Sequence, residues 1–90
     1  MTYTTATLKQ LINKLKDFCN EFNYTLEENG WHLMLMSNWL SSITHFIHID
    51  LSNNAIMCFY VLENDTSGQR YPDYLTLAEM QELNNILLEV

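Results

Sequence analysis

The 90-residue chain is short of the residues that mark several protein classes: it has two glycines, one proline, two cysteines and four basic residues. So little glycine and proline excludes collagen-like and low-complexity chains, and a hydrophobic content of 48% excludes intrinsic disorder. No apolar run approaches the roughly 18 residues of a membrane-spanning helix. Two cysteines are too few for a disulfide scaffold, so we expect Cys19 and Cys58 to be buried thiols in a reducing compartment.

The opening segment, MTYTTATLKQ, has no basic region followed by an apolar stretch, so no secretory signal is expected. The length suits a single folded unit, since domains commonly contain about 50 to 200 residues. Composition therefore predicts one globular domain over residues 1–90, located in the cytoplasm.

The scarcity of basic residues makes the chain acidic, with a formal net charge of −7. Residues 1–16 contain three lysines and no acid, whereas residues 17–90 contain all eleven acids and one basic residue, Arg70, a charge of −10. An acidic body repels phosphate backbones, so direct nucleic-acid binding is not expected. A basic protein surface would be attracted to it. The alternative is that the acidity serves solubility alone.

Hydrophobic spacing predicts a helix at each end of the chain. From Thr5 to Asn23, apolar residues recur at intervals of three and four on one helical stripe. These residues are Leu8, Leu11, Ile12, Leu15, Phe18, Cys19 and Phe22. The second helix is predicted over residues 76–90, where Thr76 and Glu79 form a capping box. Its predicted stripe contains Leu77, Met80, Leu83, Leu87 and Val90, widened by Ile86 and Leu88.

Between the helices, two turn signals predict two β-hairpins. A turn at Asn29-Gly30 sets Leu26 opposite Leu33, and a turn at Asn53-Asn54 sets Ile49 opposite Cys58. Residues 63–74 are predicted to be a long loop. The expected fold class is α+β: a four-stranded antiparallel sheet of two hairpins, flanked by an N-terminal and a C-terminal helix packed on one face.

Two-residue periodicity divides the strands between two faces. The face expected to meet the helices collects Tyr24, Leu26, Trp31, Leu33, Leu35, Ile47, Ile49, Leu51, Ile56, Cys58, Tyr60 and Leu62, with His45 among them. The other collects Glu27, His32, Met34, Met36, Phe46, His48, Asp50, Met57, Phe59, Val61 and Glu63. A solvated sheet face normally carries plainly polar residues. This one is rich in methionine and aromatic residues, with acids and histidines at its edges.

The histidines do not predict a metal site or a catalytic site. His45 and His48 are three residues apart, which places them on opposite faces of a strand, and we expect His45 to be a hydrogen-bonded core histidine. His32, Met34 and Met36 share a face, with His48 and Asp50 placed to lie beside them. Thioether and imidazole together would suit Cu(I), but the set lacks a thiolate and methionine commonly fills apolar space. We therefore expect no metal and no cofactor.

An enzyme is not expected. No serine or cysteine stands beside a base and an oxyanion hole, and no glycine-rich phosphate loop is present.

Protein binding is the function that the pattern favours. The apolar outer face is typical of an interface, and arginine and tyrosine, which the loop at residues 68–74 supplies, are frequent hot-spot residues. The predicted electrostatic contacts are Glu27, Glu28, Asp50, Glu63, Asp65 and Asp73. The predicted anchors are Phe46, Phe59, Tyr71 and Tyr74, and Arg70 is also predicted to contact the partner. The alternative is that the apolar face forms a homodimer.

In size, acidity and its helix-flanked sheet around ENGWHLML and SNNAIMCFYV, the chain resembles small acidic phage and mobile-element inhibitors, namely anti-CRISPR proteins and DNA mimics. The resemblance implies a non-enzymatic inhibitor in the host cytoplasm that occupies the nucleic-acid-binding surface of a host protein. The alternative class is a small adaptor or immunity-type protein whose partner does not bind nucleic acid.

Overall fold

Helix α1 spans Thr5–Phe22 in the computed structural model, which describes residues 5–40 and 42–88. The predicted stripe faces the core. Leu11, Leu15, Phe18 and Cys19 are buried, and Leu8, Ile12 and Phe22 pack partly buried against them. The helix ends at Phe22, and the next residue, Asn23, has a φ of 62°, in the left-handed region that asparagine tolerates. The Tyr24 N–H then donates to the Cys19 carbonyl at 2.9 Å, which closes a Schellman-type cap.

Helix α2 spans Leu77–Leu88 and begins with the predicted capping box. The Thr76 N–H donates to Glu79 Oε1 at 2.9 Å, and the Glu79 N–H donates to Thr76 Oγ1 at 3.2 Å. The predicted stripe is wrong in part. Leu83 and Ile86 are buried, but Leu77, Met80 and Leu88 are exposed and Glu79 faces inward, 8% exposed. Val90 lies outside the described residues.

A tertiary hydrogen bond accounts for the rotation of α2. The Tyr24 hydroxyl, beyond the end of α1, donates to Glu79 Oε2 at 2.5 Å. Because the capping box already holds the other oxygen of this carboxylate, Glu79 is fixed toward the sheet. Leu77 and Leu88 lie about half a turn from Glu79 around the helix axis, so they must then face solvent.

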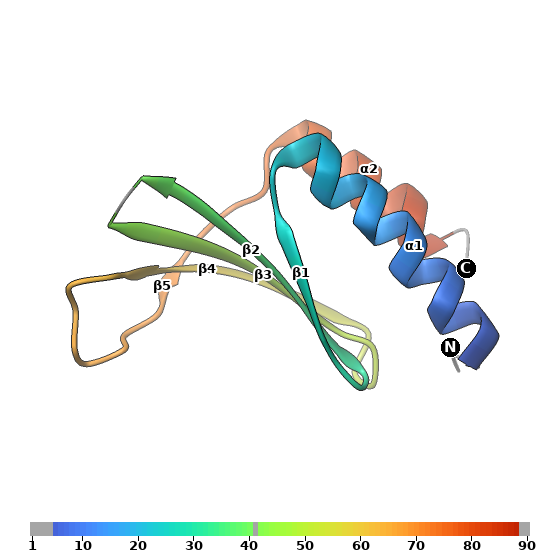
Figure 1. The fold of residues 1–90 in the computed structure, drawn as a ribbon, viewed down its shortest axis with the longest axis horizontal. Helices are drawn as coiled ribbons and strands as arrows, with labels where there is room; N and C mark the ends of the chain where they lie inside the picture. The colour runs from blue at the N-terminus through green and yellow to red at the C-terminus, as the bar shows by residue number, and fades with distance from the viewer. Residues whose placement is uncertain (1–4, 41, 89–90) are drawn as a thin grey trace.

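The strands form one antiparallel meander in the order β1-β2-β3-β4-β5 (Figure 1). Their bounds are Thr25–Asn29, His32–Leu40, Ile43–Asp50, Ala55–Leu62 and Tyr71–Pro72. The α+β class with two helices is confirmed, but the sheet has five strands, since β5 lies inside the predicted loop. Tyr71 stacks on Tyr60 with ring centroids 5.1 Å apart, and the Asp73 N–H donates to the Cys58 carbonyl at 3.1 Å. Pro72, which lacks an N–H, is tolerated because β5 is an edge strand.

The register of the first hairpin differs from the prediction by two residues. Leu26 pairs with Leu35 and not with Leu33, because the two-residue turn lies at Gly30-Trp31. Gly30 has a φ of 61° at the first central position, as a type II′ turn requires.

The second hairpin is also shifted by two residues, with Ile49 opposite Ile56 and not opposite Cys58. Its turn contains four residues, Leu51 to Asn54, and Asn54 takes the positive φ, 52°. A shift of two leaves every side chain on its predicted face, since side chains alternate with a period of two.

Both helices lie on the same face of the sheet, which we call the inner face (Figure 1). Its buried strand residues are Leu33, Leu35, Ile47 and Ile49, which form one core with α1 and α2. Trp31 and Ile56 were predicted for this core but are each 42% exposed. Trp31 sits in the turn, and Ile56 lies where β4 has no further strand beside it among the described residues.

The sheet projects beyond the helices at the end that carries the β2–β3 connection (Figure 1). None of the helices in the described part of the chain combines the length and apolar character needed to cross a membrane.

Candidate functional site

The outer face of the sheet, opposite the helices, carries the predicted side chains in transverse rows. One row runs Glu27, Met34, His48 and Met57 across β1 to β4. The next runs Met36, Phe46 and Phe59, and His32 opposes Asp50 at the turn end. The predicted membership of this face is thus confirmed for the residues that lie in strands, because it depends on alternation alone, whereas Glu63 lies beyond the end of β4.

A groove of about 360 Å³ lies on the outer face over β1 to β3. Its lining contains Glu27, Asn29, His32, Met34, Met36, Phe46 and His48. Two thioethers and an aromatic ring supply apolar surface, while a carboxylate, an amide and two imidazoles supply polar groups. Concave apolar surface with a few convergent polar groups is the usual character of a binding site.

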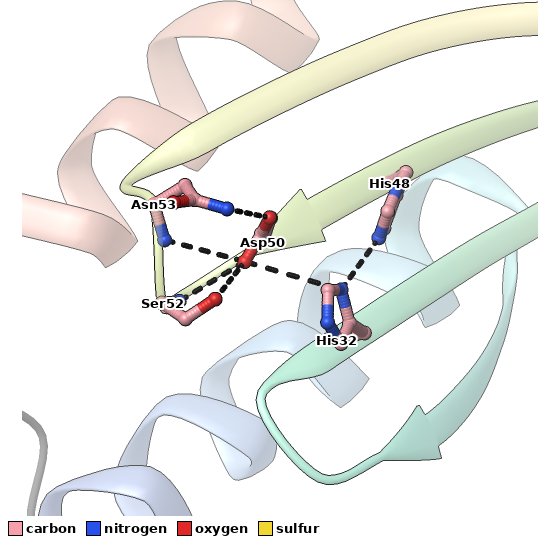
Figure 2. A network of polar contacts seen from close by, with 5 residues as sticks. All are labelled: His32, His48, Asp50, Ser52 and Asn53. Carbon is pink, nitrogen blue, oxygen red and sulfur yellow. Dashed lines mark hydrogen bonds and ion pairs between the residues drawn. The ribbon is translucent and has the colours of Figure 1, made fainter.

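A polar network joins the groove residues His32 and His48 to Asp50 and the turn that follows it (Figure 2). His32 Nδ1 lies 3.1 Å from His48 Nε2 and 3.9 Å from Asp50 Oδ1. The Ser52 hydroxyl donates to Asp50 Oδ1 at 2.6 Å, and the Asn53 side-chain amide donates to Oδ2 at 2.7 Å. These bonds lower the pKa of Asp50 from its ordinary 3.8 to about 2. Asp50 is therefore an ionised carboxylate in a fixed position at neutral pH.

Within the described ranges, no group of three or more His, Cys, Asp or Glu residues stands where it would hold a metal ion. The contact between His32 and His48 requires one ring nitrogen to donate and the other to accept. His45, as predicted, lies on the other face, where its Nδ1 is hydrogen-bonded to Asp73 Oδ2.

The aromatic part of the outer face is covered by the loop that precedes β5. Phe46 and Phe59 stack with ring centroids 5.0 Å apart, and the Arg70 guanidinium lies 4.6 Å from the Phe59 ring centroid. This is the geometry of a cation–π contact. Phe59 is only 6% exposed as a result. Phe59 therefore does not line the groove, and of the two stacked phenylalanines Phe46 does.

The other loop residues do not join the outer face. Tyr71 stacks on Tyr60 of the inner face, and its hydroxyl lies 3.5 Å from Asp65 Oδ2. Tyr74 is 87% exposed but lies beside the inner-face hollow that Glu79 lines. The predicted cluster of one arginine and two tyrosines is therefore divided: Arg70 lies over Phe59 of the outer face, whereas Tyr71 and Tyr74 lie on the inner side.

The six predicted acidic contacts are also divided. Glu27 lines the groove and Asp50 stands at its turn end. Glu28 is exposed, but it pairs with Leu33, so its side chain is on the inner side of the sheet. Asp73 also belongs to the inner face.

The two remaining acids lie in the loop between β4 and β5. Asp65 accepts hydrogen bonds from the Ser67 hydroxyl at 2.5 Å and from the Ser67 N–H at 2.9 Å, which lower its pKa. Glu63 is exposed just after the end of β4 and does not line the groove.

Sequence reasoning missed two polar contacts, Arg70 over Phe59 and Tyr24 with Glu79. Neither contact could be predicted from local residue spacing, although the capping box does predict that the Glu79 side chain is held in a fixed orientation.

Comparisons of the chain with family models, with curated proteins and with solved structures found no match.

Proposed function

We propose that this protein acts without turnover, by binding a basic host protein, one that handles nucleic acid, through the outer-face groove. The observation that carries the proposal is the groove's apolar lining of Met34, Met36 and Phe46 beside the Glu27 carboxylate. A second carboxylate, Asp50, lies just outside the groove, 3.9 Å from its lining residue His32. A lysine or arginine side chain matches this arrangement, because it has an apolar stem and a cationic head. The stem would pack on the thioethers while the head meets a carboxylate.

The charge of the whole chain supports the same partner. A net charge of −7 attracts a basic surface over distances beyond direct contact and raises the association rate. A surface that normally holds nucleic acid is basic and would be blocked by such a protein. This is the action of an anti-CRISPR protein or DNA mimic, and its place would be the host cytoplasm.

The test begins with capture of partners from host lysate, followed by binding measurements on the purified partner. Glu27→Gln and Glu28→Gln are a matched pair, because the two neutralise adjacent exposed carboxylates on opposite faces. We expect Glu27→Gln to reduce affinity by about 2- to 5-fold, mainly through slower association. Glu28→Gln should have little effect. Equal losses would mean that only net charge matters and that the groove is not the site.

An apolar change tests the groove lining separately. Phe46→Ala should weaken binding by about 10-fold or more, mainly through faster dissociation, provided that circular dichroism shows a folded variant. Unchanged affinity would exclude the groove. A partner that is not basic and whose binding is indifferent to salt would support the adaptor or immunity alternative.

A further inference from the structure

Strand β1 forms one edge of the sheet. Among the described residues it pairs with β2 alone, and four of its five residues are exposed. We call its unpaired side the open edge. Folded proteins commonly protect an edge with a proline, a bulge, a very short strand or charged side chains. The edge strand on the opposite side, β5, contains only Tyr71 and Pro72. β1 has no proline and no bulge, and its two charges, Glu27 and Glu28, are both negative.

The backbone pattern shows which groups of β1 face the open edge. The Leu51 N–H donates to the Trp31 carbonyl, so the odd-numbered residues of β2 bond to β3 and the even-numbered residues bond to β1. Leu26 and Glu28 lie opposite odd-numbered residues of β2. Their N–H and C=O groups therefore point away from β2, toward the open edge, where a further strand could bond to them.

The outer-face groove extends to this edge. Its lining includes Glu27, whose side chain points to the face opposite that of Leu26 and Glu28. Neighbouring strands lie about 4.8 Å apart, so a side chain on the outer face of an added strand needs to cross only β1 to reach the Met34 thioether. On the inner face, an added strand would place a side chain beside Leu26, which packs against the core.

Charge determines which kind of strand fits. A second copy of β1 would oppose Glu27 and Glu28 with carboxylates, in a chain whose net charge is −7, and like charges on facing strands are unfavourable. A strand from a basic protein would place a lysine or arginine beside Glu27 instead. An apolar residue suits the position beside Leu26. The matching segment therefore alternates basic residues, on the outer face, with apolar residues, on the inner face.

We propose that the partner adds an extended segment of alternating basic and apolar residues to the open edge of β1, by backbone hydrogen bonds to Leu26 and Glu28. Its basic side chains enter the outer-face groove, and its apolar side chains lie on the side of Leu26. The inference rests on the proposed function, because it names the form in which a basic partner enters the same groove. In this mode of recognition the backbone bonds supply affinity and the alternate side chains supply specificity.

A short synthetic peptide that alternates lysine with valine tests the pairing with the full chain. We expect the fluorescently labelled peptide to bind, as measured by anisotropy. Glu28→Pro should weaken binding by about 10-fold or more, because proline has no N–H to donate to the added strand. Proline is tolerated at an edge position, and circular dichroism checks the fold. Glu28→Gln, which removes the same charge but keeps the N–H, should change affinity by less than about 2-fold. Absence of binding, or equal affinity of the two variants, overturns the proposal.

Methylated peptides test the backbone contact without any change in the protein. One peptide carries methyl groups on its valine amides and the other on its lysine amides. Only one of these two sets of N–H groups can face β1, because N–H groups alternate between the two sides of a strand. One peptide should therefore bind about 10-fold more weakly or worse, while the other keeps its affinity. Equal affinities of the two peptides would mean that the backbone is not used, and would overturn the proposal.

Variants in the groove separate the added strand from the proposed function. If Glu27→Gln and Phe46→Ala weaken binding of the peptide and Glu28→Pro does not, the added strand is wrong and the groove remains the binding site. If Glu28→Pro alone weakens binding, the added strand is supported, and the groove, on which the proposed function depends, is not the site.

Discussion

Removal of the Tyr24 hydroxyl is a direct test of what orients the second helix. In Tyr24→Phe, Glu79 Oε2 loses a donor at 2.5 Å, while Oε1 keeps the Thr76 N–H. Glu79 is 8% exposed, so water does not freely replace the lost hydroxyl. An unsatisfied buried acceptor costs about 1–3 kcal/mol, with charged groups at the upper end. We expect a loss of about 2 kcal/mol in the free energy of unfolding.

Chemical denaturation measures this loss, and a thermal melt should show the melting temperature falling by roughly 10 °C for a domain of this size. Tyr74→Phe is the matched control, because it removes the same hydroxyl from a side chain that is 87% exposed. It should change stability by less than about 0.5 kcal/mol. Equal losses in the two variants would refute the assignment of Tyr24 and Glu79 as the contact that sets the rotation of α2.

The same contact has a pH signature. Burial, and next the hydrogen bond to Glu79, raise the pKa of Tyr24 above its ordinary value of 10. A raised pKa means that the folded state favours the protonated phenol, so this stabilisation is complete below pH 10 and is lost as pH rises toward the folded-state value. Tyr24→Phe should therefore lose less stability than the unsubstituted chain above pH 10. Parallel alkaline curves would contradict this explanation.

Three further predictions concern the sheet. Ile49→Ala should cost about 2–5 kcal/mol through lost burial and the cavity it leaves, whereas Met34→Ala on the outer face should cost much less; equal losses would mean that the faces are misassigned. Titration with Zn(II) or Cu(I) should show no stoichiometric tight binding, and a one-to-one complex that disappears when His32 and Met34 are replaced would overturn this expectation. The pKa of Asp50 is lowered to about 2 from 3.8, so its stabilisation is present above pH 3.8 and is lost as pH falls toward 2. Asp50→Asn should show a shallower acid loss across that window, and identical acid curves would argue against the bonds from its turn.

Alternation and helical spacing in the sequence were sufficient to predict the two helices, the strands β1 to β4 and the two faces of the sheet. The α1 stripe is buried as predicted, and Met34, Phe46 and His48 share the outer face as predicted. The predicted faces remain correct despite the two-residue errors in register in both hairpins, because the direction of the side chains repeats every two residues. Periodicity is a property of the local backbone and can be read without knowing which strands meet.

Long-range contacts decided the rest. Tyr24 and Glu79 are 55 residues apart, yet their hydrogen bond determines which face of α2 is buried. The Arg70 side chain lies over the ring of Phe59, a predicted anchor, and covers it. Tyr71 of β5 stacks on Tyr60 and therefore lies on the inner face. An amphipathic helix with apolar residues on more than one side has several rotations that bury similar area, so a single tertiary hydrogen bond is enough to choose among them. The rotation of α2 therefore depends on a contact between two elements, and it cannot be predicted from the local pattern of either one.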